Sequence, residues 1–112
     1  MSARVLLVFA TFPDIDTARK IGAQLVEKQL AACVNLVPQI ESIYRWKGSI
    51  ETSAEILALI KTTADTYAAL ESRLRELHPY EVPEIIAVDL QVGLPAYLGW
   101  VRESVLSADF AD

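Results

Sequence analysis

The chain has 112 residues, of which 53% are hydrophobic and 22% are charged, and its formal net charge is -5. This length supports one hydrophobic core and this apolar content excludes a disordered chain, so we expect a single domain over residues 1–112. The acidic balance argues against nucleic acid as a partner, because affinity for a phosphate backbone depends on clustered Lys and Arg.

The apolar segments are too short to enter a membrane. The run near the start, residues 5–10, has six residues, fewer than a signal-peptide core or a membrane span requires. We therefore expect a cytoplasmic protein with no membrane partner. The single cysteine, Cys33, excludes an internal disulfide framework and a zinc cluster built from several cysteines of one chain.

The first half of the chain predicts a strand, a helix and a long hairpin. The apolar run 5–10 is typical of a strand covered on both faces, in the middle of a sheet. Asp14 is a suitable N-cap for a helix that reaches Lys28. Extended chain follows from Cys33 to Trp46, with Pro38 marking a bulge or an edge position, and a short turn leads into a returning strand over residues 50–62.

The hairpin is unusually long, and its length predicts self-association. Arms of a dozen residues span roughly 40 Å at about 3.3 Å per residue, so they must overrun a small domain. The overhanging end carries Tyr44, Trp46 and Ile50, which one subunit cannot easily cover. We expect an obligate oligomer.

The second half predicts a helix, a strand and a final helix. Tyr67, Leu70, Leu74 and Leu77 form the apolar face of a helix that Pro79 ends at His78. Apolar residues at every second position over residues 86–92 predict a fourth strand, and Pro95 suits the first turn of a C-terminal helix. The order of elements predicts an α+β, ferredoxin-like split βαβ fold with two helices on one face of a four-stranded antiparallel sheet.

The segment between the second helix and the fourth strand is chemically dense. It contains the only histidine, His78, together with Tyr80, Glu81 and Glu84, and two prolines stiffen it. Imidazole suits copper or zinc, and a thiolate such as that of Cys33 suits Cu(I).

Several strings of the sequence carry a family resemblance. They are Thr11-Phe12-Pro13-Asp14, Leu30-Ala31-Ala32-Cys33-Val34-Asn35, Ser42-x-Tyr44-x-Trp46-x-Gly48, Ile60-Lys61-Thr62, the segment from His78 to Ile85, and Tyr97-Leu98-x-Trp100. In this order and spacing the chain resembles the CutA family of divalent-cation tolerance proteins. The resemblance implies a ferredoxin-like subunit in a homotrimer, a link to divalent-metal tolerance, and copper binding. It carries over His78, Cys33, Glu81 and Glu84 as metal ligands, Tyr80 beside them, and Tyr44, Trp46 and Trp100 as aromatic elements of the oligomer.

Each candidate ligand also has a structural interpretation. A histidine at the end of a helix is stabilised by the dipole and by unpaired carbonyls, and a cysteine behind a helix usually packs in the core. Loop carboxylates such as Glu81 and Glu84 are commonly solvated or paired with arginines, for example Arg73 or Arg102.

Three functions remain open from the sequence. The first is a non-enzymatic homotrimer that binds copper or another divalent metal ion. The second is a sensor of small molecules or anions, like the trimeric PII proteins, with Arg45, Lys47 and Lys61 facing the ligand. The third is a stable trimeric scaffold for an unidentified protein partner. An enzyme has little support, because no nucleophile elbow, P-loop or HExxH motif is present.

Overall fold

The structure is a computed structural model, and residues 3–106 are described. These residues form four strands and three helices in the order β1 (Val5–Phe12), α1 (Ile15–Glu27), β2 (Cys33–Trp46), β3 (Ser49–Thr63), α2 (Ala64–Leu77), β4 (Ile85–Asp89) and α3 (Pro95–Ser104). None of these helices has the length and apolar content that crossing a bilayer requires.

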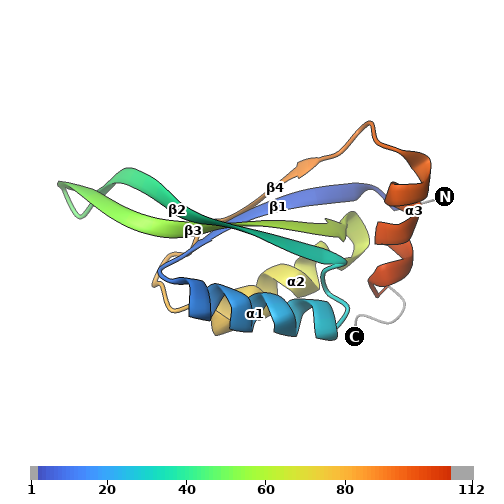
Figure 1. Ribbon diagram of the computed structural model, residues 1–112, viewed down its shortest axis with the longest axis horizontal. Coiled ribbons are helices and arrows are strands. Elements are labelled where there is room, and N and C mark those ends of the chain that lie inside the picture. The colour runs from blue at the N-terminus through green and yellow to red at the C-terminus, as the bar shows by residue number, and fades with distance from the viewer. Residues whose placement is uncertain (1–2, 107–112) are drawn as a thin grey trace.

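The sheet has the predicted ferredoxin-like topology. Its strand order is β2-β3-β1-β4, and all neighbouring strands are antiparallel. Helices α1 and α2 lie side by side beneath one face of the sheet, and α3 crosses one end of it (Figure 1). The split βαβ prediction is therefore confirmed, and β1 lies in the middle of the sheet as expected.

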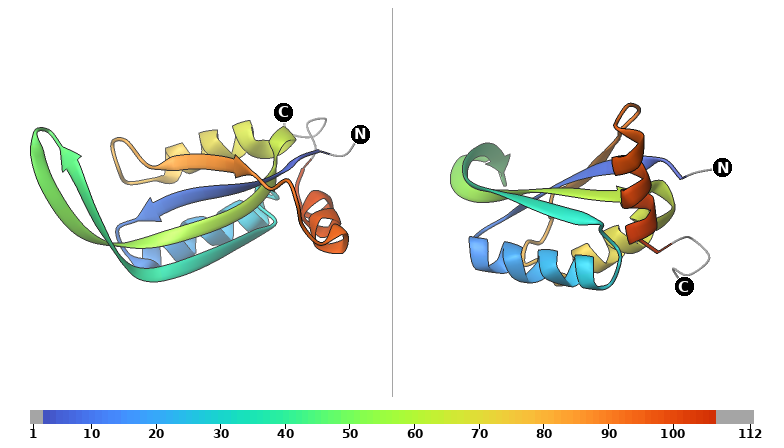
Figure 2. Two further views of the ribbon diagram at one scale, coloured as in Figure 1. Left: turned by 90° about the horizontal axis from the view of Figure 1, so that it is seen from above. Right: turned by 45° about the vertical axis from the view of Figure 1, so that its right-hand side comes forward.

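The hairpin of β2 and β3 is as long as the sequence predicts. Its arms have 14 and 15 residues, and its turn projects well beyond the helices (Figure 1). The register shifts between Val37 and Ile40, so the bulge predicted at Pro38 is present, on an edge strand. Lys47 and Gly48 form the turn with φ values of 50° and 83°. Beyond the bulge the hairpin curls back toward the loop 78–84 (Figure 2).

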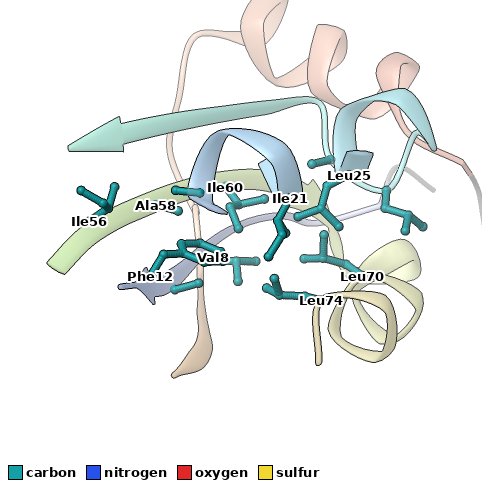
Figure 3. Packing of buried hydrophobic residues seen from close by; sticks show 13 residues of the cluster. Val8, Phe12, Ile21, Leu25, Ile56, Ala58, Ile60, Leu70 and Leu74 are labelled. Carbon is teal, nitrogen blue, oxygen red and sulfur yellow. The ribbon is translucent and has the colours of Figure 1, made fainter. Parts of the chain in front are cut away.

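The core lies between the sheet and the helices α1 and α2. Val8, Ile60, Leu25, Leu70 and Leu74 come from four different elements and are almost completely buried (Figure 3). Helix α1 begins where the sequence predicts, because the Asp14 carboxylate accepts a hydrogen bond from the Thr17 amide at 2.7 Å.

Strand β4 is shorter than the alternation predicts. It ends at Asp89, which is opposite Leu6, and the Leu90 amide then donates to the Val5 carbonyl. Since β1 begins at Val5, Val92 has no partner strand and is exposed. The apolar alternation of residues 90–92 therefore does not extend the sheet.

One face of the sheet is apolar and uncovered within the chain. We name it the open face, and it lies opposite α1 and α2; its apolar residues on β1, β3 and β4 are Leu7, Phe9, Leu57, Leu59, Ile86 and Val88. Ile86 and Val88 are 58% and 50% exposed. The expectation that β1 is covered on both faces is thus wrong for the isolated chain, because the helices cover only one.

Candidate functional site

The hairpin and the loop 78–84 enclose a groove, which we name the hairpin groove. Its volume is about 670 Å³, and its lining comprises Thr11, residues 42–44, Trp46, Glu55, residues 79–82 and Glu84. Beyond its bulge the hairpin curls toward the loop (Figure 2), and the hairpin, the loop and Thr11 of β1 together line the groove. This volume falls in the range typical of small-molecule sites.

Glu55 is buried beside the groove and was not singled out by sequence reasoning. Its side chain is 8% exposed, and the Tyr80 hydroxyl donates a hydrogen bond to its Oε2 at 2.7 Å. Burial, followed by this bond to Glu55, raises the pKa of Tyr80, so the phenol stays a neutral donor. The alternation of side chains along a strand could have identified its position: Glu55, Leu57 and Leu59 are two residues apart, so they lie on the same face of β3.

His78 ends α2 and ties the loop to β1. The Tyr80 amide donates to His78 Nδ1 at 3.1 Å, and His78 Nε2 lies 2.7 Å from the Thr11 carbonyl. Since an amide can only donate, Nδ1 must accept, which places the ring proton on Nε2 and directs it to Thr11. The ring also stacks on Phe12 with 4.8 Å between centroids. Both ring nitrogens therefore have protein partners.

The surroundings of His78 favour its neutral form. Desolvation by burial lowers the pKa of His78, against the smaller opposing effects of the Thr11 carbonyl and the Glu55 charge. The position agrees with a histidine that ends a helix, since His78 is the C-cap of α2. The expected stabilisation by the helix's own carbonyls is wrong, because the ring bonds to β1 instead.

Cys33 lies far from the other predicted ligands. It begins β2 opposite Lys61, six residues along β3 from Glu55, which corresponds to roughly 20 Å of strand. Its thiol is half-buried and donates to Asn35 Oδ1 at 3.7 Å, so it is not a core residue. Tyr97 of α3 is its neighbour: burial and then Cys33 raise the pKa of this tyrosine.

Glu81 and Glu84 are exposed and line the hairpin groove. The expected arginine partners are engaged elsewhere: Arg73 bonds to Glu76 at 3.1 Å, and Arg102 donates to the Ala3 carbonyl at 2.7 Å. The two loop carboxylates thus share the groove with Glu55.

The four predicted metal ligands do not form one site within a chain. His78, Glu81 and Glu84 lie at the groove end of the sheet and Cys33 at the opposite end. Across residues 3–106 there is no cluster of three or more His, Cys, Asp or Glu side chains able to hold a metal ion. The residues of one chain therefore do not fit a copper or zinc centre, which needs several ligands at bonding distance.

Comparison with known proteins supports the family resemblance. The family model described as CutA1 divalent ion tolerance protein matches residues 6–104. Protein CutA of Mus musculus is 50% identical over 99 residues, which are 88% of this chain and 56% of the mouse protein. The divalent-cation tolerance protein CutA of Thermus thermophilus is 47% identical over 98 residues, 88% of this chain and 95% of that protein. The chain spans little more than half the length of the mouse relative.

A solved structure agrees with the sequence matches. CutA from the bacterium Xylella fastidiosa superimposes with a TM-score of 0.90 at 48% identity, covering 93% of this chain and 100% of that one. The Xylella fastidiosa protein is therefore similar to this chain both in sequence and in fold. This chain belongs to the CutA1 family of divalent ion tolerance proteins.

Proposed function

We propose that this protein is a non-enzymatic homotrimer that supports tolerance to divalent cations and binds copper or another divalent metal ion. The observation that carries the proposal is the family membership, with a relative named divalent-cation tolerance protein at 47% identity over 98 residues. The proposed place of action is the cytoplasm, which fractionation of cells with an antibody against the chain would test.

The open face supports self-association. It presents six apolar side chains on three adjacent strands, and the projecting hairpin adds Tyr44 and Trp46. Soluble monomers rarely expose apolar patches of this kind, and a second copy is a partner with matching chemistry.

Light scattering after gel filtration tests the trimer. The expected mass is three times the 12.4 kDa of one chain. Val88→Glu places a charge on the open face, on the edge strand β4, and should shift the mass toward one chain, whereas Glu103→Gln on the exposed side of α3 should leave it unchanged. A folded wild-type monomer at micromolar concentration would contradict the trimer.

The metal part of the proposal requires ligands from more than one subunit, because those of one chain are scattered. We propose His78, Glu81, Glu84 and Cys33 as the candidate ligands, joined across the interfaces of the trimer. Copper titration by calorimetry should show an affinity at least about tenfold lower in Cys33→Ser and in the double variant Glu81→Gln, Glu84→Gln, since loss of one ligand group costs at least that much. His78→Ala is informative only if it remains folded, because the ring is buried.

Two controls sharpen the copper experiment. Glu27→Gln removes an exposed carboxylate of α1 that is not one of the candidate ligands, and should bind copper like the wild type. Val88→Glu should lose the binding together with the trimer. Unchanged affinity in all ligand variants would remove these residues from the proposed site.

A sensor of small molecules is the second candidate, and the hairpin groove favours it. A groove of about 670 Å³ accommodates a metabolite-sized ligand. The groove does not support a sensor of anions, because Arg45, Lys47 and Lys61 are not among the residues that line it. A thermal-shift screen with nucleotides and organic anions should therefore give no stabilisation, and a rise in Tm with an anion would revive the anion sensor.

A further inference from the structure

The charged side chains that line the hairpin groove are all carboxylates. They are Glu55 from β3 and Glu81 and Glu84 from the loop, and within residues 3–106 no Lys, Arg or His lines the groove. Charges of one sign in a concave site raise the local concentration of the opposite ion. The groove is thus an environment for a cation.

Aromatic rings form much of the remaining wall. Tyr44 and Trp46 come from the hairpin and Tyr80 from the loop. Hydrogen bonds orient both phenols: the Tyr44 hydroxyl lies 3.0 Å from Ser53 Oγ, and the Tyr80 hydroxyl donates to Glu55. The Trp46 ring already attracts a cation, since Lys47 Nζ lies over it at 5.6 Å from the centroid.

Glu55 is only partly satisfied by the protein. A carboxylate has about four acceptor sites, and the hydrogen bond described for this side chain is the one from the neutral Tyr80 hydroxyl. Within residues 3–106 no buried side-chain oxygen lacks a partner, so the remaining acceptor sites of Glu55 are open to solvent and to a ligand in the groove. An ammonium group in the groove would supply both a positive charge and donors to a residue that is 8% exposed.

We propose that the hairpin groove binds a small organic cation that carries an ammonium group and an apolar body. The ammonium group is held by Glu55 and the loop carboxylates, and the apolar body packs on Trp46 and the two tyrosines. A bare metal ion fits this lining less well, because the groove is far larger than an ion and, within residues 3–106, its carboxylates do not form a cluster of three ligands able to hold one. The groove shares Glu81 and Glu84 with the proposed metal ligands and Tyr44 and Trp46 with the proposed trimer surface, so the experiment excludes metal and its first variant changes Glu55, which belongs to neither.

Calorimetry with three ligands of one shape tests the proposal in buffer containing EDTA, so that metal binding has no part in the result. Phenethylamine is a cation, 2-phenylethanol is neutral and 3-phenylpropionate is an anion. We expect phenethylamine to bind at least about tenfold more tightly than the alcohol, and the anion not to bind. Absence of phenethylamine binding at millimolar concentration, or equal affinity for the alcohol, would overturn the proposal.

Variants then place the binding in this groove. Glu55→Gln keeps an acceptor for Tyr80 but removes the charge, and should weaken phenethylamine binding at least about tenfold. Glu41→Gln removes the same charge from an exposed position on β2 outside the lining, and should bind like the wild type. Trp46→Leu, at a partly exposed position, supplies a second test if Glu55→Gln does not fold, and should weaken binding several-fold. Wild-type affinity in the folded Glu55 variant, or in the Trp46 variant, would refute the assignment.

Discussion

Replacing Tyr80 with Phe removes the hydroxyl that donates to Glu55 and preserves the ring. Hydrogen bonds to charged groups contribute about 1.5–3 kcal/mol, and a buried acceptor that loses its donor pays the desolvation penalty. Glu55 is 8% exposed, so water can replace the lost hydroxyl only poorly. Tyr80 is itself partly exposed, so we expect a loss of stability below the upper end of this range. We expect the free energy of unfolding to fall by about 2 kcal/mol.

Urea denaturation at pH 7 and one fixed chain concentration measures this loss, because unfolding of an oligomer depends on concentration. Tyr44→Phe is the matched control. Its hydroxyl bonds to the neutral Ser53, and Tyr44 is 42% exposed, so its loss should cost only about 0.5 kcal/mol. In a Glu55→Gln background the cost of Tyr80→Phe should drop by about 1 kcal/mol. Equal losses in the two Tyr→Phe variants would refute the idea that Glu55 depends on Tyr80.

Three further predictions follow from the helices and the loop. The hydrogen bond from the Thr17 amide holds the pKa of Asp14 below its ordinary 3.8. The wild type should therefore be more stable than Asp14→Ala above pH 3.8, and this advantage should disappear as the pH falls through the lowered pKa. Urea denaturation of both proteins at pH 7 and at pH 2 measures the difference. Burial lowers the pKa of His78 from 6.5, so the fold holds a neutral ring and the wild type should lose stability as the pH drops below 6.5, more than His78→Gln does; a flat pH profile would contradict this. Leu70→Ala, at a completely buried position of α2, should cost about 2–5 kcal/mol, against less than about 0.5 kcal/mol for the exposed Ser72→Ala.

The sequence by itself determined the elements and their order. Asp14 caps α1 through an amide three residues away, Pro38 marks the bulge, and the Lys47-Gly48 turn requires positive φ. These are local effects, in which a side chain acts on backbone within a few residues, so a single sequence is enough to predict them. The exact strings also pointed to the family that comparison confirms.

The end of β4 and the separation of the candidate ligands were decided by the tertiary structure. Alternation continues to Val92, but β4 stops where β1 has no more residues to pair. Cys33 and His78 suit the same metals by chemistry, yet the antiparallel register of β2 on β3 carries them to opposite ends of the sheet.

The environment of Glu55 also could not be predicted from the sequence. Its position on β3 is known from alternation, but its burial depends on how far the hairpin curls after the bulge and on Tyr80, a residue 25 positions away, reaching it from the loop. Local periodicity determines which face of a strand a side chain occupies. Only the packing of distant segments determines what that face meets, because those contacts depend on the twist and bending of the whole sheet.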